Sequence, residues 1–357
     1  MDISSTIIRL LDEHVDFSDV HAQTNDFLRV RIDGDLKPLS DDIISDEDIT
    51  EYLKHVMVED PSRVLRDGKG DAGLAFTFHG ARFRCEISWQ GGMRMPSMVM
   101  RRLNDKIPSF ANLGLPPVVE SFAKRSKGLV IITGQTGSGK TTTLASLIDG
   151  INSTLQGKIV TIEDPIEYIH VSKRCMISQR EIGHDTSGFS SGLRAAVRQD
   201  PDVIMIGELR DKETMNAALA AAETGHLVFA TLHTPNAKQT IERIAGFYEG
   251  EEKAWIVNVL SSVLIGIVSQ VLLKKAKGGR CLGYEILVNN EAVAQQIREN
   301  KVAQIQNNIV TGKQHGMVTL NAVLAELVRN NEVTVQEALY AAYDVENLRK
   351  ELGLARP

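Results

Sequence analysis

The chain has 357 residues, which exceeds the length of one ordinary domain and predicts two. Hydrophobic residues make up 43% and charged residues 24%, the composition of a soluble globular protein. The formal net charge of −6 and a pI near 5.9 argue against nucleic acid as the main partner, and leave room only for a local basic channel.

The three cysteines, Cys85, Cys175 and Cys281, are far apart and match no disulfide or metal spacing. This usage predicts a reducing compartment. The first residues, Met1–Ser5, carry an acid early and no apolar signal segment. We therefore expect a cytoplasmic protein that is not exported.

Residues 1–106 have the size and the pattern of a separate domain. Residues 28–32 alternate apolar and polar side chains, and Asp33-Gly34 after them is a hairpin-turn signal. Residues 74–87 predict a second hairpin, and residues 46–58 are helix-like. Together these elements predict a small N-terminal α+β domain.

A segment rich in helix and strand breakers, residues 107–117, is the predicted linker to the rest of the chain. From residue 118 to residue 287, short and nearly continuous apolar runs alternate with helical segments, which is typical of parallel strands covered on both faces. This pattern predicts a RecA-like α/β core. Residues 288–357 predict a helical C-terminal region. The predicted core strands are residues 128–133, 158–163, 203–207 and 227–232.

One apolar stretch of the core, residues 255–273, carries no charge and is about long enough to span a bilayer. Polar residues interrupt it, and three of them, Asn258, Ser262 and Ser269, fall near one helical stripe. We therefore expect a helix buried inside the domain or between subunits, rather than a membrane span.

Residues 134–141 form a complete phosphate-binding loop (P-loop) with the pattern Gly-x-x-x-x-Gly-Lys-Thr. A strand before the loop and a helix after it give the geometry that an anion site needs, because glycines let backbone N–H groups turn toward phosphate oxygens. Lys140 can reach the β- and γ-phosphates, and the Thr141 hydroxyl can bind Mg²⁺. We predict that nucleotide is bound by Gly134, Gln135, Thr136, Gly137, Ser138, Gly139, Lys140, Thr141 and Thr142.

Hydrolysis also needs a group that orients water, and acidic residues follow two of the predicted strands. Glu163 ends the second strand and is our candidate for the general base. Glu208 follows an apolar strand, as in the second nucleotide motif, and can hold Mg²⁺ through water. An acidic surface loop and a strand-capping acid are the alternative interpretations. The spacing leaves open which glutamate polarises the attacking water.

The segment from Thr224 to Thr234 is a predicted strand with His226 just before it and His233 at its end. We do not expect a zinc site, because side chains seven residues apart on a strand point to opposite faces, and no third ligand is near. We interpret His233 as a γ-phosphate sensor or as a link to the next subunit, and His226 as structural.

A nucleotide held between domains or subunits also needs cations from outside the P-loop to neutralise charge in the transition state. In the first domain, Arg82 and Arg84 alternate on one strand face, and Arg101 closes another predicted strand. We rank Arg101 first, then Arg82 and Arg84. Two arginines on either side of the third core strand, Arg194 and Arg210, are further candidates.

Residues 193–211, with the sequence Leu-Arg-Ala-Ala-Val-Arg-Gln-Asp-Pro-Asp-Val-Ile-Met-Ile-Gly-Glu-Leu-Arg-Asp, resemble the signature of the type II/IV secretion ATPases. The P-loop, an acidic box at residues 162–165 and a histidine box at residues 224–234 stand at the family's expected positions. Within the family, the chain is most similar to the retraction ATPases of type IV pili, the motors of twitching motility. The resemblance covers nearly the whole chain.

This resemblance implies a RecA-like P-loop core with a small N-terminal α+β (PAS-like) domain and a helical C-terminal tail. It implies a homohexamer that binds ATP and Mg²⁺ between the N-terminal domain of one subunit and the C-terminal domain of its neighbour. It gives Glu163 the base role and Glu208 the Mg²⁺ role, with arginines of the first domain reaching across the ATP. The implied partners are a platform protein of the inner membrane, met at its cytoplasmic face, and through it the pilin fibre.

One feature departs from the retraction ATPases, which carry an Ala-Ile-Arg triplet in their C-terminal helices that retraction needs and hydrolysis does not. The corresponding residues here are Ala292-Val293-Ala294, so Ala294 replaces the arginine, whereas Ile297-Arg298-Glu299 matches. Besides a main retraction motor, two subtypes therefore stay open. One is an accessory enzyme that works beside a second retraction ATPase, and the other is a motor of a conjugative pilus or secretion system.

Two other classes of function fit the chain less well. A RecA-like nucleic-acid motor needs a basic strip with aromatic residues, and aromatic residues make up only 5% of the chain. A regulator that binds nucleotide without hydrolysing it needs neither Glu163 nor Glu208, and the chain has both.

Overall fold

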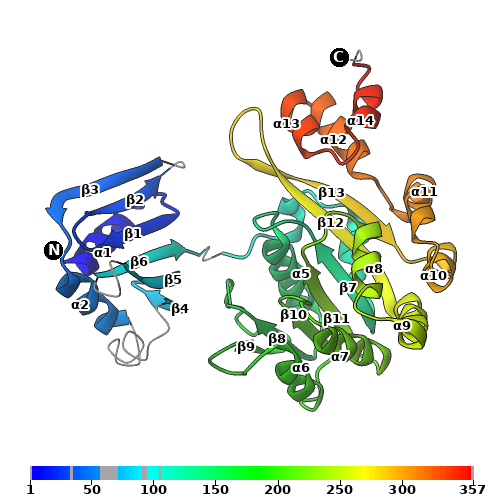
Figure 1. Ribbon diagram of the computed structural model, residues 1–357, viewed down its shortest axis with the longest axis horizontal. Helices are drawn as coiled ribbons and strands as arrows, with labels where there is room; N and C mark the ends of the chain where they lie inside the picture. Colours follow the sequence, from blue (N-terminus) through cyan, green and yellow to red (C-terminus); the bar gives the residue numbers. More distant parts are fainter. Residues whose placement is uncertain (1, 33–34, 57–70, 91–94, 104–105, 355–357) are drawn as a thin grey trace. The chain divides into compact units, whose positions relative to one another are not determined.

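The structure is a computed structural model in which the chain divides into two compact units (Figure 1). The first unit comprises residues 1–106 and the short segment 165–169, and the second comprises residues 107–164 and 170–357. The residues that the structure describes are 2–32, 35–56, 71–90, 95–103 and 106–354.

The first unit is built on a six-stranded antiparallel sheet with the strand order β3-β2-β1-β6-β5-β4. Apolar side chains alternate along its strands, so one face packs with the two helices into a single core and the other face stays polar. The elements are α1 (Ile3–Asp12), β1 (Asp19–Gln23), β2 (Phe27–Ile32), β3 (Asp35–Ile43), α2 (Asp46–Val56), β4 (Asp71–Phe78), β5 (Ala81–Gln90) and β6 (Met95–Arg102).

The predicted elements of this unit are confirmed where the structure describes them. The second hairpin is β4–β5, and its turn residues His79 and Gly80 both have positive φ values, of 47° and 79°. Ile32 pairs with Asp35 across the first predicted hairpin, whose turn residues 33–34 lie outside the described part of the chain. Residues 57–58 of the predicted helix also lie outside it.

A row of charged residues crosses the polar face of this sheet. Asp19 is paired in register with Arg31 on one side and with Arg101 on the other, and Arg101 is paired with Arg84. The Asp19 side chain is buried, and its carboxylate accepts hydrogen bonds from Arg101 Nε at 2.8 Å and from Ser18 Oγ at 2.7 Å. Burial alone would raise the pKa of Asp19, but these hydrogen bonds and the Arg101 charge outweigh it and lower that pKa.

The second unit contains a seven-stranded sheet with the order β13-β12-β7-β11-β10-β8-β9. Its first six strands in the chain run parallel, and β13 joins β12 antiparallel at one edge. The strands are β7 (Gly128–Thr133), β8 (Lys158–Glu163), β9 (Met176–Glu181), β10 (Val203–Ile206), β11 (Leu227–Leu232), β12 (Leu264–Lys274) and β13 (Arg280–Val288).

Helices cover both faces of this sheet. Leu129 and Ile131 of β7 join a core formed with α6 to α11, whereas Val130 and Ile132 join a core formed with α4 and α5. The α-helices are α4 (Pro117–Phe122), α5 (Lys140–Thr154), α6 (Phe189–Val197), α7 (Lys212–Glu223), α8 (Ala237–Ala245), α9 (Gly250–Val263), α10 (Glu291–Arg298), α11 (Ile305–Thr311), α12 (Leu320–Arg329), α13 (Val335–Ala341) and α14 (Val345–Glu351), and the 3₁₀ turns are η1 (Phe110–Leu113), η2 (Val302–Gln304) and η3 (Gly312–His315).

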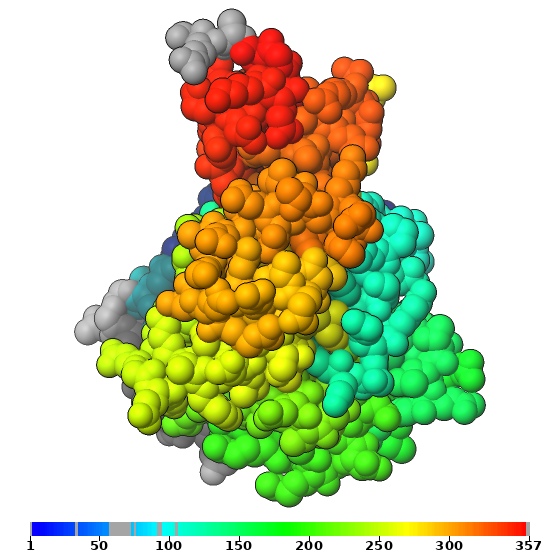
Figure 2. Space-filling model, turned by 90° about the vertical axis from the view of Figure 1, so that its right-hand side faces the viewer, coloured from blue at the N-terminus to red at the C-terminus, as the bar shows by residue number. Residues whose placement is uncertain are grey.

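The C-terminal helices α12 to α14 have a small core of their own, which Leu273 of the β12–β13 hairpin joins. They lie at one end of the second unit, with α10 and α11 between them and α9 (Figure 2). The fold is therefore the expected one, an α/β P-loop core with a small N-terminal domain and C-terminal helices. The four predicted core strands are also confirmed, although β10 ends one residue earlier, at Ile206.

The prediction of one helix over residues 255–273 is wrong in its second half. Helix α9 ends at Val263, and residues 264–274 form β12, which pairs with β7 and β13 on its two sides. A strand buried on both faces needs a continuous apolar run, which periodicity alone cannot distinguish from a buried helix. Within the described residues, no helix has both the length and the apolarity needed to cross a membrane.

We predict that Asp19→Asn destabilises the first unit in a pH-dependent way. Because the pKa of Asp19 is lowered in the folded protein, its contribution to the free energy of unfolding is present at pH 7 and is lost as the pH falls below 3.8 through the lower native value. We expect a loss of about 1–2 kcal/mol at pH 7 and a smaller one near pH 3, measured by urea unfolding. Asp16→Asn, at an exposed aspartate, is the control, and a loss that does not depend on pH would contradict the prediction.

Candidate nucleotide-binding site

The P-loop joins the end of β7 to the start of α5, as the motif predicts. Gly134, Gly137 and Gly139 have φ values of 143°, 80° and 90°, which side chains other than glycine rarely adopt. A Cβ atom on Gly134 would lie 2.3 Å from the Gln270 carbonyl oxygen, so β12 leaves room only for glycine there. The loop is thus a backbone cradle that opens at the N-terminus of a 15-residue helix.

Two side chains of the P-loop are buried within it. Lys140 Nζ donates to the carbonyl oxygens of Gly134 at 2.8 Å and Gln135 at 3.0 Å, so the ammonium lies over the loop. Ser138 Oγ is buried and lacks a hydrogen-bond partner among the described residues. The cradle, the ammonium group and this unpaired hydroxyl fit a phosphate group.

The remaining predicted P-loop residues are more accessible. Gln135 and Thr136 are exposed at the tip of the loop, and Thr141 and Thr142 lie half-buried in the first turn of α5. The described residues include no cluster of three or more His, Cys, Asp or Glu side chains that could hold a metal ion. Mg²⁺ does not need such a cluster, because it takes few protein ligands and keeps phosphate oxygens and waters. The Thr141 hydroxyl is an oxygen donor of the kind that fits this ion.

The order of the parallel strands brings the other candidates to the same edge of the sheet. Strand β10 lies between β8 and β11, so Glu208, just after β10, is flanked by Glu163 at the end of β8 and by His233 just after β11. The Gly207 N–H donates a hydrogen bond to the Ile162 carbonyl oxygen at 2.8 Å, which holds the start of the Glu208 turn against β8.

Glu163 is buried and held in one orientation. Its Oε1 atom accepts from Thr161 Oγ1 at 2.6 Å and from Gln179 Nε2 at 3.1 Å. Sequence reasoning missed both partners. Thr161 lies two residues before Glu163 and therefore on the same strand face, so alternation could have found it. Gln179 comes from β9, a polar edge strand whose sequence contains no apolar run that would predict it.

Glu208 is the centre of an ion-pair cluster. Its carboxylate lies 2.7 Å from Arg210 Nε and 3.1 Å from His233 Nε2, and the Arg210 guanidinium also lies 3.6 Å from Asp164. The hydrogen bond from Arg210 to Glu208 raises the pKa of the Arg210 guanidinium. The structure therefore brings together the acidic box, the strand acid, the terminal histidine and one candidate arginine.

The other candidate arginines lie elsewhere. Arg194 is exposed in the last turn of α6. Arg82, Arg84 and Arg101 belong to the first unit, where Arg84 pairs with Glu86 at 2.9 Å and Arg101 pairs with Asp19. Their part in a nucleotide site remains a prediction.

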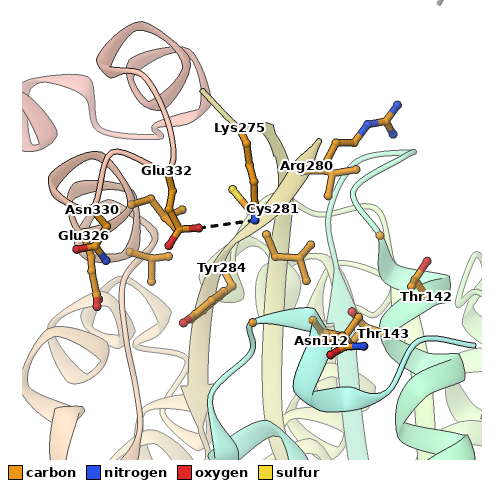
Figure 3. Close-up of a pocket in the computed structure, with 17 residues that line it drawn as sticks. Asn112, Thr142, Thr143, Lys275, Arg280, Cys281, Tyr284, Glu326, Asn330 and Glu332 are labelled. Atoms are coloured by element: carbon orange, nitrogen blue, oxygen red, sulfur yellow. Dashed lines mark ion pairs between the residues drawn. The ribbon is translucent and has the colours of Figure 1, made fainter. Parts of the chain in front are cut away.

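A cavity of about 420 Å³ lies beside the P-loop helix (Figure 3). Asn112 before α4 and Thr142 and Thr143 of α5 line one side, and residues of α12 line the other. The β12–β13 hairpin contributes Tyr284 and Cys281 between them (Figure 3). The volume is that of a small-ligand pocket.

Comparison with known proteins places the chain among secretion and pilus ATPases. The family model for type II/IV secretion system proteins matches residues 14–353. The type IV pilus retraction ATPase PilT of Pseudomonas aeruginosa is 40% identical over 92% of this chain and 95% of its own length. The type IV pilus ATPase PilU of the same organism is 38% identical over 91% of this chain and 85% of its own.

The fold is also that of a solved structure. The crystal structure of the pilus retraction motor PilT with bound ADP superposes with a TM-score of 0.89 and 41% identity, over 96% of this chain and 99% of that one. That relative binds a nucleotide on the same fold.

We predict that Gly134→Ala damages the P-loop more than Gly137→Ala. Both positions have positive φ, but a Cβ at Gly134 would collide with the Gln270 carbonyl oxygen, whereas a Cβ at Gly137 has no atom within 4 Å. We expect Gly137→Ala to cost about 1 kcal/mol of strain and Gly134→Ala to cost more and weaken ADP binding at least tenfold. Thermal unfolding and ADP titration measure both effects, and equal losses in the two variants would contradict the argument.

Proposed function

We propose that this chain, which belongs to the type II/IV secretion system protein family, hydrolyses ATP to drive the retraction and disassembly of a type IV pilus. The observation that carries the proposal is the convergence of the P-loop, Glu163, Glu208 and His233 at one edge of the parallel sheet. The similarity to the retraction ATPase PilT over nearly the full length supports the pilus as the object of the work.

In the proposed mechanism, the P-loop N–H groups and Lys140 bind the β- and γ-phosphates, which requires Lys140 to leave the loop carbonyls. Thr141 and Glu208 would hold Mg²⁺, which neutralises phosphate charge. Glu163 accepts the proton of the attacking water, and the hydrogen bonds from Thr161 and Gln179 keep one carboxylate orientation. His233, paired with Glu208, senses the γ-phosphate.

The cavity beside α5 is our proposed nucleoside site. It begins at Gly139, Thr142 and Thr143, on the helix whose N-terminus faces the phosphates, so one ligand can occupy both places. Asn112 and Tyr284 supply an amide and an aromatic ring, groups that suit hydrogen bonding and packing against a base.

We propose that the working form is a homohexamer with ATP between subunits. Charge on the transferred phosphoryl group then needs cations from the neighbour, and Arg101, Arg82 and Arg84 on the first unit's polar face are the candidates. Arg210, already paired with Glu208, can act from within the subunit, and exposed Arg194 can face another subunit. In a ring closed by identical head-to-tail contacts, each nucleotide site receives these arginines from one neighbouring subunit.

The proposed partners are an inner-membrane platform protein, met at its cytoplasmic face, and through it the pilin fibre. We expect no role for nucleic acid. Ala294, which replaces the triplet arginine, lies on the buried face of α10. The packing around this position is therefore built for a small side chain and not for an arginine. This favours an accessory enzyme beside a second retraction ATPase. The alternative is an ATPase of a conjugative pilus or secretion system.

We predict that Glu163→Gln lowers kcat for ATP hydrolysis at least a hundredfold without disrupting the oligomer, because the amide cannot accept the proton. Lys140→Ala should abolish hydrolysis and weaken ATP binding. Phosphate release and size-exclusion chromatography measure the two properties. In cells that lack any second retraction ATPase, Glu163→Gln as the only copy should make surface pili accumulate. Normal piliation together with lost hydrolysis would move the enzyme to another secretion system.

The shared site predicts that two inactive variants restore each other. A subunit with Arg101→Ala keeps Glu163, and a subunit with Glu163→Gln keeps Arg101. In an equal mixture, about a quarter of the subunit interfaces therefore combine an intact Glu163 with an intact Arg101. We expect hydrolysis to reappear on mixing and co-assembly, and to be absent from each variant alone. Arg9→Ala, on α1 of the same unit, is the control and should retain activity by itself. A mixture as inactive as its components would contradict the role of Arg101.

A further inference from the structure

Glu285 is a buried carboxylate that hydrolysis, as proposed above, does not use. It lies on β13 opposite Ser269 of β12, which in turn lies opposite Thr133 of β7. Thr133 Oγ1 donates to Ser269 Oγ at 3.1 Å, so this row of side chains starts at the last residue before the P-loop. Only 2% of Glu285 is exposed.

The Glu285 carboxylate holds the start of helix α8. Its Oε1 atom accepts the Ala237 N–H at 2.9 Å, and its Oε2 atom lies 3.5 Å from Gln306 Nε2 of α11. Burial raises the pKa of Glu285, although these two hydrogen bonds oppose the rise. A buried carboxylate at a helix N-terminus is stabilised by the helix dipole and fixes the helix in return.

Tyr343 reaches the same place from the C-terminal helices. It lies between α13 and α14, and its hydroxyl donates to the Pro235 carbonyl oxygen. Tyr343 is 43% exposed, yet partial burial, and then the nearby Glu285 charge, raise its pKa to about 12, so the hydroxyl keeps its proton at neutral pH. Two adjacent backbone groups, Pro235 C=O and Ala237 N–H, are therefore held by the C-terminal half of the second unit.

The segment that these residues hold is the direct continuation of the histidine box. His233 is two residues before Pro235, and its Nε2 atom lies 3.1 Å from Glu208 Oε1. Between them, Thr234 Oγ1 lies 2.7 Å from Thr240 Oγ1 of α8, which fixes Thr234 to the same helix. Residues 234–237 thus connect the His233–Glu208 pair at the sheet edge with the C-terminal helices.

We propose that Glu285 and Tyr343 are positioning residues that hold His233 against Glu208 and thereby make turnover depend on the placement of the C-terminal helices. The inference rests on the proposed ATPase function. It assigns the C-terminal helices a role that P-loop chemistry alone does not require: a partner that shifts α11 or the α13–α14 connection would move the 234–237 segment and change the His233–Glu208 pair.

The test compares Tyr343→Phe with Tyr340→Phe. The first substitution removes only the hydroxyl that binds Pro235, and the second changes a tyrosine that is 90% exposed on the neighbouring helix. Loss of one hydrogen bond predicts a decrease of about fivefold in kcat for Tyr343→Phe, with the KM for ATP and the affinity for ADP unchanged. Tyr340→Phe should match the unchanged protein. An unaltered kcat in Tyr343→Phe would overturn the proposal.

A double-variant cycle separates positioning from general support of the fold. If Tyr343 acts through His233, Tyr343→Phe should have no further effect in a His233→Ala background. A decrease of the same factor in both backgrounds would overturn the proposal. At the other contact, Glu285→Gln keeps an oxygen for the Ala237 N–H and should retain most of kcat, whereas Glu285→Ala should lose it. If Glu285→Ala does not fold, the tyrosine pair still decides.

A second readout does not need turnover. The imidazole resonances of His233, assigned by their disappearance in His233→Ala, should shift in Tyr343→Phe and stay in place in Tyr340→Phe. If the unchanged protein hydrolysed no ATP, the proposed function would fail, yet a His233 shift would still support the structural link. Hydrolysis without any shift or loss of kcat in Tyr343→Phe would defeat the link alone.

Discussion

The alignment of parallel strands in the second unit is the constraint on which its candidate site depends. Parallel strands end at a common edge, so a loop, two acids and a histidine that are far apart in sequence come together without any long-range side-chain contact to guide them. The interior position of β10 then decides which of them touch, because Glu208 has a neighbour strand on each side. Its carboxylate meets His233 from the β11 side as a result, whereas Arg210 reaches it from two residues further along the same segment.

Much of this arrangement could be predicted from sequence, for a physical reason. Strands buried on both faces are continuous apolar runs, and the P-loop has few conformations other than the one its glycines permit, so the strand ends and the Gly134–Thr141 loop are fixed locally. Polar edge strands leave no such pattern, and Gln179 of β9 therefore escaped notice. Residues 264–273 were misassigned because an apolar run has no period. The targets of the candidate arginines could not be predicted from the sequence, because exposed cations such as Arg194 follow no pattern that identifies what they contact.

The two ends of the second unit's sheet differ in what they can transmit. At the β9 edge, Gln179 donates to Glu163 and accepts the His170 N–H, and both contacts stay within that end of the sheet. At the opposite edge, the β12–β13 hairpin contacts the P-loop through the Gln270 backbone, lines the cavity, and packs on the C-terminal helices. A displacement of those helices and a ligand in the cavity would therefore both act on the same hairpin.

The unequal surroundings of the three thiols have a practical consequence. Cys85 and Cys175 are buried in two different cores, whereas Cys281 is half-buried on the wall of the cavity beside α5. Burial raises the pKa of the Cys281 thiol as well, so labelling needs a mildly alkaline buffer and a long reaction time. A fluorophore attached there, with no cysteine removed elsewhere, would turn the native polypeptide into an optical sensor of whether that chamber is filled.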